Sequence, residues 1–312
     1  MAMKYQDLLH KKIGVLFGGK STERSTSLRS GADAYQGLLE LGFSNVVNID
    51  LDDRPIFKIL DSGIEYAFLA LHGTDYEDGK LQGALELLGI PYTGCGVLAS
   101  AVSFHKVSTK IVAQGIHIPT PDWLLLNAQN HLADLSFDGP YIIKPPAQGS
   151  SIDVYKVESR ETLSEKVDLM LQTYGEVLIE KFISGRDLTI GAVGNPGNIR
   201  VLPILEIHAA SGIYDRQAKF GDETTYTVPA RVEEPVRKNA EEMVNKLYVA
   251  LQCRAVTRMD FRLNGDDLYF IEANTIPGMN RTTSNMSRIL RAAGITYHDF
   301  IEGILLDSFC TE

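Results

Sequence analysis

Two carboxylates and one amide in the C-terminal third of the chain have the types and spacing of a magnesium site. Asp260 lies in the apolar run 259–263, and Glu272 and Asn274 end the next apolar run, after the turn sequence Asn-Gly-Asp-Asp at 264–267. This pattern predicts a β-hairpin, in which Glu272 and Asn274 share one face and Asp260 can oppose them. Magnesium binds such oxygen ligands and usually shares its shell with nucleotide phosphates. A polar hairpin at a solvated sheet edge is the alternative, but an unpaired carboxylate within an apolar segment is costly.

Two further segments are candidates for holding a nucleotide. A predicted strand at 141–144 runs into a loop of small residues that includes Ser150 and Ser151. The backbone amides and hydroxyls of such a loop can hold phosphate oxygens while Lys144 adds a positive charge, although a glycine-serine turn is more often only a turn. A predicted strand at 177–183 leads into a linker whose backbone can hydrogen-bond a purine between apolar side chains.

Length and composition favour a cytoplasmic enzyme. The chain has 312 residues, and 44% of them are apolar. This length and apolar content are enough to bury a core and form two or three subdomains. The net charge is −10. The negative charge disfavours nucleic acid as a partner. No apolar run is long enough to span a membrane, and the charged N-terminus is unlike a signal peptide. Three widely separated cysteines do not predict a disulfide framework.

The order of predicted elements indicates an α/β protein. Strands alternate with helices in the first part of the chain, with strands expected at 13–17, 46–49 and 66–71 and helices at 27–41 and 80–88. Such alternation predicts a parallel sheet whose ligands bind beyond the carboxyl ends of the strands. Glu23 and His72 would lie on that rim.

The remaining chain divides into a middle part and a C-terminal part, which gives three expected domains: 1–103, 104–186 and 187–312. The last contains the acidic hairpin, a helix expected at 233–251 and a helical tail at 284–309. A polar segment at 214–225 has the length and position of a lid over a site.

Several separated motifs occur in order along nearly the whole chain, and together they resemble those of the D-alanine:D-alanine ligase family in the ATP-grasp superfamily. They are Gly18-Gly19-x-Ser21-x-Glu23-Arg24, His72-Gly73 with Glu77-Asp78-Gly79, Tyr92-Thr93-Gly94-x-Gly96, Lys144-Pro145 with Gly149-Ser150-Ser151, Glu180-Lys181, Ala218-Lys219, Arg258-x-Asp260, and Glu272-Ala273-Asn274-Thr275 with Pro277-Gly278-Met279. The resemblance implies an ATP-grasp fold, α+β overall, with an N-terminal parallel-sheet domain that binds substrate, a central ATP-grasp subdomain, and a C-terminal ATP-grasp subdomain with the metal site and lid.

The resemblance also implies a reaction. ATP phosphorylates the carboxylate of a first D-amino acid, the amine of a second attacks the acyl phosphate, and ADP and phosphate leave. The implied cofactors are ATP and two magnesium ions, and the implied pathway is peptidoglycan precursor synthesis. We expect small amino acids as partners, no nucleic acid or membrane, and a homodimer.

Roles for individual residues follow from the resemblance. Glu23 would receive the ammonium of the first substrate, His72 would lie near its carboxylate, and Arg258 with the Gly278 amide would stabilise the oxyanion. The expected catalytic set is Glu23, Ser150, Lys219, Arg258 and Gly278. The expected substrate-binding set is His72, Phe220, Asn280 and Thr283. The expected ATP-binding set is Lys106 and Lys144 at the phosphates, Glu180, Lys181 and Ile183 at the adenine, Asp187 at the ribose, and Ser151. The expected metal ligands are Asp260, Glu272 and Asn274.

Four of these residues also have simpler interpretations. Glu23 and Arg24 could form an exposed salt bridge, and His72 could be a hydrogen-bonded structural histidine at a strand end. Arg258 could be a surface strand residue, although it shares a strand face with Asp260. Lys219 could be a solvated charge.

Departures from the family pattern lie mainly on the acceptor side. Phe220 replaces a usual tyrosine whose hydroxyl belongs to a hydrogen-bonded group near the second substrate, and phenylalanine cannot make those bonds. Family members that join D-alanine to a hydroxy acid such as D-lactate can carry phenylalanine there. The family usually has aspartate at the position of His105, glycine at that of Asp153 and glutamate at that of Asp187. Thr283 stands at the usual serine for the carboxylate of the second substrate, and Asn280 and Arg281 add polarity to that pocket.

The sequence therefore leaves three functional hypotheses. The first is D-alanine:D-alanine ligation. The second is a related ligase with another acceptor, either a hydroxy acid or an amino acid joined to a secondary-metabolite carboxylate. The third is a nucleotide-binding protein without catalysis, against which Arg258 argues, because binding alone requires no oxyanion arginine.

Overall fold

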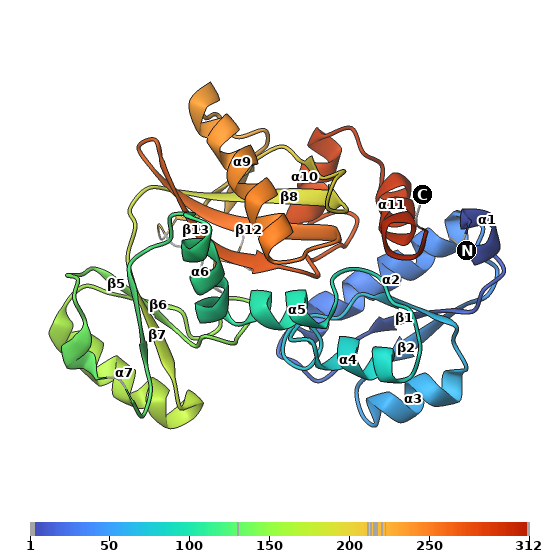
Figure 1. Cartoon of the computed structure of the whole chain (residues 1–312), viewed down its shortest axis with the longest axis horizontal. Coiled ribbons are helices and arrows are strands. Elements are labelled where there is room, and N and C mark those ends of the chain that lie inside the picture. Colours follow the sequence, from blue (N-terminus) through green and yellow to red (C-terminus); the bar gives the residue numbers. More distant parts are fainter. Residues whose placement is uncertain are drawn as a thin grey trace.

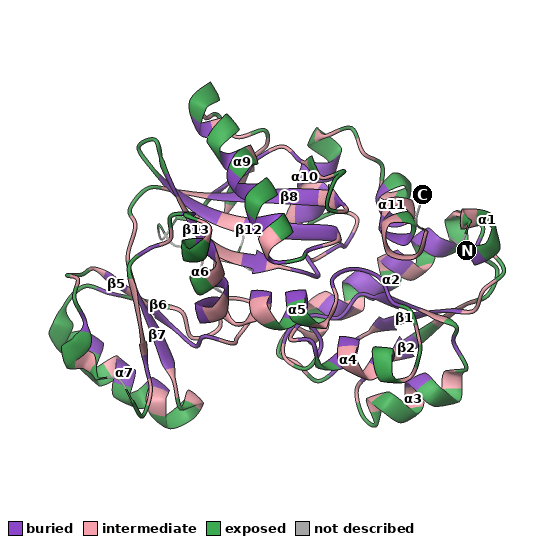
Figure 2. Cartoon of the chain, in the orientation of Figure 1, coloured by how far each residue is buried: buried purple, intermediate pink, exposed green. Residues whose placement is uncertain are grey.

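Apolar strand segments gather into three β-sheets in the computed structural model of the chain, which describes residues 4–129, 131–210, 212, 214, 218–219, 221 and 223–310. The sheet built from the C-terminal part lies between the other two along the long axis of the molecule (Figure 1). The strands are largely buried, whereas the outer faces of the helices are exposed (Figure 2).

The N-terminal sheet is parallel, in the order β2-β1-β3, as the alternation of strands and helices predicts. Its strands are β1 (Ile13–Phe17), β2 (Val46–Asp50) and β3 (Tyr66–Leu69), and its helices are α1 (Tyr5–Leu8), α2 (Arg24–Glu40), α3 (Pro55–Ser62) and α4 (Lys80–Leu87). Arg24 donates to Asp50 at 2.8 and 2.6 Å, which ties the start of α2 to the end of β2. A Cβ at Gly18, where φ is 74°, would lie 2.0 Å from the Asp50 carboxylate, so this turn requires glycine.

The central sheet is antiparallel, in the order β4-β7-β5-β6. Its strands are β4 (Trp123–Leu126), β5 (Tyr141–Lys144), β6 (Tyr155–Val157) and β7 (Val177–Lys181). The helices before and beside it are α5 (Val97–Phe104), α6 (Lys106–Gly115), a 3-10 turn η1 (Leu132–Asp134) and α7 (Arg160–Tyr174). Leu163, Val167 and Met170 of α7 join the core of this sheet, which anchors the helix to it.

The C-terminal sheet is antiparallel, in the order β11-β10-β8-β12-β13, with β9 beside β8. Its strands are β8 (Arg186–Gly194), β9 (Arg200–Val201), β10 (Leu205–His208), β11 (Thr225–Thr227), β12 (Ala255–Asn264) and β13 (Asp267–Asn274). The predicted hairpin is confirmed as β12 and β13, and its register pairs Asp260 with Glu272 and Arg258 with Asn274. Helix α9 (Glu234–Ala250) lies beside β8 and β13.

The expected helical tail is two helices rather than one. They are α10 (Asn285–Ala292) and α11 (Tyr297–Phe309), and Gly294 between them has a left-handed φ of 69°. Both helices pack into the same hydrophobic core as the N-terminal sheet, through residues such as Met286 and Ile301. The first and last parts of the chain therefore share one core.

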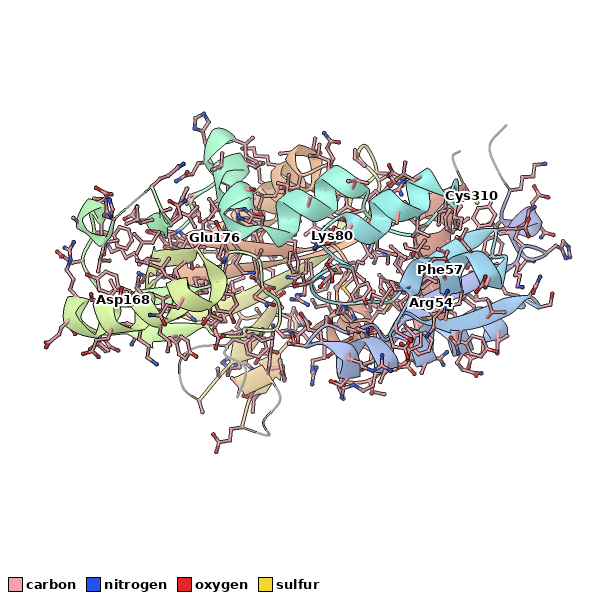
Figure 3. All side chains as sticks on the ribbon, turned by 90° about the horizontal axis from the view of Figure 1, so that it is seen from below. Arg54, Phe57, Lys80, Asp168, Glu176 and Cys310 are labelled. Carbon is pink, nitrogen blue, oxygen red and sulfur yellow. The ribbon has the colours of Figure 1, made fainter. Side chains whose placement is uncertain are left out.

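The boundaries at 103/104 and 186/187 stay a proposal. The first boundary falls within α5, before its last residue Phe104, and α5 and α6 both pack on β13. Asp168 on α7 and Cys310 after α11 mark opposite ends of the molecule (Figure 3). Among the described residues no helix has the length and apolar character needed to cross a membrane, and Cys95, Cys253 and Cys310 are free thiols.

Candidate active site

The described residues form two adjoining cavities. One lies between the central and C-terminal sheets, and the other, of about 550 Å³, lies beyond the carboxyl end of β3. Every predicted site residue except Phe220, which lies outside the described residues, lines at least one of them. The residues that line both are Lys106, Gln148, Ser150, Tyr214, Lys219 and Glu272.

Lys106, the first residue of α6, lies where the two cavities meet. Its Nζ donates to the Gln148 carbonyl at 2.7 Å and lies 3.3 Å from Glu272 Oε2. The preceding His105 caps the helix, since its Nδ1 accepts from the Ser108 amide at 3.2 Å. An imidazole nitrogen thus performs the capping for which an aspartate is more usual.

A buried network of two lysines and one glutamate supports the floor of the first cavity. Glu180 Oε1 lies 2.5 Å from Lys110 Nζ, and Oε2 lies 2.6 Å from Lys144 Nζ. Burial opposes the charge on Glu180, but the two ammonium groups outweigh it and lower the pKa of this carboxyl. Burial lowers the pKa of Lys110 to about 8, and the second ammonium, on Lys144, acts in the same direction.

Sequence reasoning missed Lys110, and it assigned Glu180 to adenine. The Glu180 side chain is already held by the two lysines, so any contact to a base would come from its backbone. Lys110 lies four residues after Lys106, and helical spacing puts both on one face of α6. That spacing was the signal that could have revealed it.

The loop after β5 approaches the N-terminal part closely. A Cβ at Gly149 would lie 1.9 Å from Glu23 Oε1. Ser150 and Ser151 both have a left-handed φ of 52°, and Ser151 donates to the Tyr214 carbonyl at 3.0 Å. The loop therefore connects Glu23 to the segment that contains Tyr214.

Asp153, in place of the usual glycine, takes a left-handed φ of 51° that aspartate tolerates better than most residues. Its carboxylate accepts hydrogen bonds from the hydroxyls of Tyr174 and Tyr155, which lower its pKa. The departure from the family pattern is thus accommodated within this loop.

The segment after β7 is tied to the C-terminal sheet by Arg262. Its Nε donates to the Ile183 carbonyl at 3.0 Å, and its Nη1 lies 2.7 Å from Asp187. The guanidinium also lies 5.3 Å from the ring centre of Phe182. Burial raises the pKa of Asp187, and Arg262 opposes this. Ile183 and Asp187 therefore border the first cavity on a well-supported segment.

The hairpin brings Asp260, Glu272 and Asn274 together, and its carboxylates are balanced by cations. Arg258 donates to both oxygens of Asp260, each at 3.1 Å, and Thr189 donates to Asp260 Oδ1 at 2.5 Å. No group of three or more His, Cys, Asp or Glu side chains is placed to hold a metal in the described part of the chain. Two carboxylates and an amide oxygen on one hairpin fit magnesium only if other oxygen ligands complete the shell.

The Glu272 carboxyl is half-buried beside several cations. Burial raises its pKa, but Lys106, Lys144, Lys219 and Arg258 outweigh that effect and bring the pKa to about 2. The junction of the two cavities therefore combines one carboxylate with several cations, as a site that handles phosphate requires. Arg258 is only 8% exposed, so its interpretation as a surface residue is wrong.

His72 is a buried structural link as well as a cavity residue. Its Nδ1 is 3.1 Å from the Ile276 carbonyl, and its Nε2 is 3.1 Å from Ser30 Oγ, which accepts from the Met279 amide at 3.3 Å. Burial lowers the pKa of His72. Its main visible role is to join the end of β3 to the loop that contains Gly278.

Glu23 does not pair with Arg24, because Arg24 pairs with Asp50 instead. The Glu23 carboxylate faces the second cavity, as does a second carboxyl that sequence reasoning did not assign to the site. This is Glu77, which accepts from the Gly73 amide at 2.6 Å. Burial and the nearby Glu23 charge raise the pKa of Glu77.

Comparisons with known proteins agree with this geometry. The chain matches the family descriptions "D-ala D-ala ligase C-terminus" over residues 112–306 and "D-ala D-ala ligase N-terminus" over residues 50–95. A D-alanine–D-alanine ligase of Desulforudis audaxviator is 40% identical over 303 residues, covering 95% of this chain and 97% of the relative. The corresponding protein of Bordetella petrii is 38% identical, covering 96% and 92%.

Solved structures give the same result. The D-alanine–D-alanine ligase of Bacillus anthracis in complex with ATP has a TM-score of 0.81 and 30% identity, covering 96% of this chain and 97% of that chain. The VanG D-Ala:D-Ser ligase of Enterococcus faecalis, at 24% identity and a TM-score of 0.82, shares the fold. With ordered motifs, an ATP-grasp arrangement of sheets and relatives at this level of identity, the chain belongs to the D-alanine–D-alanine ligase family.

Proposed function

We propose that the protein is an ADP-forming ligase that joins two D-alanine molecules through an acyl phosphate, in peptidoglycan precursor synthesis. The observation that carries this proposal is the meeting of the two cavities at Lys106, Lys219 and Glu272. A nucleotide in one cavity would present its terminal phosphate to a carboxylate in the other. Phosphoryl transfer depends mainly on such positioning and on charge stabilisation.

ATP binding is supported by the Bacillus anthracis structure in complex with ATP. We place the base beside the segment at Ile183 and the ribose near Asp187. Lys144 and Lys106 then lie along the phosphates, with the small-residue loop of Ser150 and Ser151 above them. Lys181, which is exposed at the end of β7, would close the rim beside the base.

Asp260, Glu272 and Asn274 would hold two magnesium ions together with nucleotide phosphates. Bound magnesium would neutralise charge on the phosphate oxygens during transfer. Arg258 and Lys106, which balance the two carboxylates in this structure, would then be released toward substrate and phosphate. The backbone of Arg258 would stay paired with Asn274 while its side chain turns.

The second cavity would hold both amino acids. Glu23 would bind the donor ammonium, and one donor carboxylate oxygen would attack the γ-phosphorus, releasing ADP. The acceptor amine would then attack the acyl carbon, and Arg258 and the Gly278 amide would stabilise the charge that develops on the acyl oxygen. Breaking the bond between the acyl carbon and the phosphate oxygen would release phosphate, and the amine would lose a proton.

The hydroxy-acid acceptor is the second candidate, and Phe220 in the sequence favours it. A missing tyrosine hydroxyl removes about 0.5 to 1.5 kcal/mol of hydrogen bonding, which is about a factor of two to twelve. Phe220→Tyr should therefore raise the ratio of dipeptide to depsipeptide when D-alanine and D-lactate compete. An unchanged ratio would remove Phe220 from acceptor choice.

The proposed function is tested by phosphate release across D- and L-amino acids and D-hydroxy acids, with mass detection of products. We expect ATP-dependent formation of D-alanyl-D-alanine with one phosphate per dipeptide. Phosphate release without any ligated product would contradict the proposal. We further propose a cytoplasmic location and a homodimer, the latter to be tested by light scattering of the purified protein.

A further inference from the structure

Arg288 presents a positive charge to the second cavity. It lies in the first turn of α10 and lines the cavity wall together with Gly278 and Asn280. Its guanidinium lies 4.0 Å from the ring centre of Tyr226 and donates to the Thr283 carbonyl. A stacked and tethered guanidinium is held in one orientation, so its remaining N–H groups are available for a planar anion.

Within the part of the chain that the structure describes, Arg288 forms no ion pair. The neighbouring Arg281, by contrast, lies 2.7 Å from Glu40. Arg288 has five N–H donors, and among the described residues its guanidinium has one hydrogen-bond partner, the Thr283 carbonyl. A half-buried guanidinium of this kind favours an anionic partner, and a carboxylate suits its geometry.

The residue that the sequence assigns to the acceptor carboxylate is already engaged. Thr283 donates its hydroxyl to Asn280 Oδ1 at 3.0 Å. The same oxygen accepts from the amides of Thr282, Thr283 and Ser284 at 2.8 to 3.2 Å. Asn280 therefore organises the turn before α10 and uses the Thr283 proton, so the carboxylate requires another donor.

We propose that Arg288 binds the carboxylate of the acceptor amino acid. This inference rests on the proposed ligase function and gives its acceptor site a specific anchor. The Arg288 side chain would fix the acceptor at the end opposite its amine, so that the amine faces the acyl carbon near Arg258 and Gly278. An acceptor without a carboxylate would lose this contact.

The test compares two acceptors that differ only in that charge. D-alanine is the donor, D-alanine and D-alaninamide compete as acceptors, and mass spectrometry gives the ratio of free-acid to amide product. Arg288→Met should lower this ratio by about 10- to 100-fold, the effect of one charge-assisted hydrogen-bonded pair. The two amines differ in intrinsic reactivity, but that difference is the same for every variant and cancels in the comparison.

Arg291→Met is the matched control. Arg291 lies on the same helix and donates to the carbonyls of Arg281 and Thr282, each at 3.1 Å, but it lines neither cavity. The Arg291→Met variant should give the same ratio of free-acid to amide product as the wild type. Arg288→Lys keeps the charge and should give an intermediate ratio, and unchanged ATP affinity should show that each variant is folded.

An Arg288→Met ratio equal to those of the wild type and Arg291→Met would overturn the role of Arg288 while leaving the ligase function intact. A fall in the ratio with Arg29→Met but not with Arg288→Met would also overturn it, because Arg29 lines the same cavity. A wild-type protein that forms no dipeptide would refute the proposed function and the role of Arg288 with it.

Discussion

Lys110 Nζ lies 2.5 Å from Glu180 Oε1, and both side chains are almost completely buried. The same carboxylate holds Lys144 at 2.6 Å on its other oxygen. Lys144 lines the first cavity, which we propose binds the nucleotide. Lys110 would therefore act on nucleotide binding indirectly, by fixing the carboxylate that orients Lys144. The fully buried ammonium of Lys110 also carries its own desolvation cost, which Glu180 and the Thr120 hydroxyl help to offset.

Lys110→Met should therefore weaken both stability and nucleotide binding. Removing one partner of a buried pair costs about 3 to 5 kcal/mol of stability. We expect a value near the lower end, about 3 kcal/mol, because Lys144 still pairs with Glu180 in this variant. Urea unfolding and calorimetry with ATP measure the two effects. The control is Lys246→Met, whose exposed pair with Glu242 at 2.6 Å should be worth less than about 1 kcal/mol. Equal losses in both variants would contradict this account.

Magnesium binding should require nucleotide. Asp260, Glu272 and Asn274 would supply only part of a shell, and Arg258 and Lys106 already contact the two carboxylates. Calorimetry should show much weaker magnesium binding to the free protein than to its ADP complex. Glu272→Gln should abolish turnover and keep the fold. Equally tight magnesium binding with and without ADP would rule out a shared shell.

Protonation of His72 should lower the free energy of unfolding of the protein as the pH falls. Burial lowers the pKa of His72 from its ordinary value of 6.5. Between that lowered pKa and 6.5 the unfolded chain binds more protons than the native state, so the free energy of unfolding falls as pH falls below 6.5. One group contributes a slope of at most about 1.4 kcal/mol per pH unit. Urea unfolding at several pH values should give a shallower slope for His72→Gln, and an identical slope would exclude His72 as the cause.

Gly149→Ala should damage the donor site without changing the backbone. A Cβ there would lie 1.9 Å from Glu23 Oε1, so the carboxylate would have to move. We expect kcat/KM for D-alanine to fall about tenfold or more, equivalent to at least about 1.4 kcal/mol. Gly115→Ala is the control, because a Cβ at Gly115 has no neighbour within 4 Å. Steady-state kinetics measure this effect. An unchanged kcat/KM in Gly149→Ala would contradict the prediction, because it would mean that the Glu23 carboxylate can move without loss of activity.

The acidic hairpin could be predicted from sequence because its information is local. The turn at 264–267 sets the pairing of residues 261–264 with 267–270, which the sequence predicts. A β-bulge between Asp260 and Phe261 then shifts the register by one residue and places Asp260 opposite Glu272, and this shift was not predicted. The parallel N-terminal sheet was predictable for the same reason, since strand and helix periods alternate along the chain.

The contacts that the sequence could not predict join residues that are far apart along the chain. Lys110 meets Glu180 across 70 residues, and no periodic pattern records that contact. The hydroxyl of Thr283 donates to Asn280 Oδ1, a hydrogen bond that residue type alone does not predict. The two bonds of His72 similarly depend on Ser30 and the distant Ile276. Phe220 lies outside the described residues, so its role stays a prediction from the sequence.

The central claim is that the donor carboxylate is phosphorylated, and isotope transfer tests it most directly. D-alanine labelled with heavy oxygen in its carboxylate is incubated with ATP and magnesium, and the released phosphate is analysed by mass spectrometry. The account predicts that each turnover moves one labelled oxygen from the donor carboxylate into inorganic phosphate, with D-alanyl-D-alanine and ADP as the other products. Unlabelled phosphate, or label in AMP, would contradict an acyl phosphate intermediate.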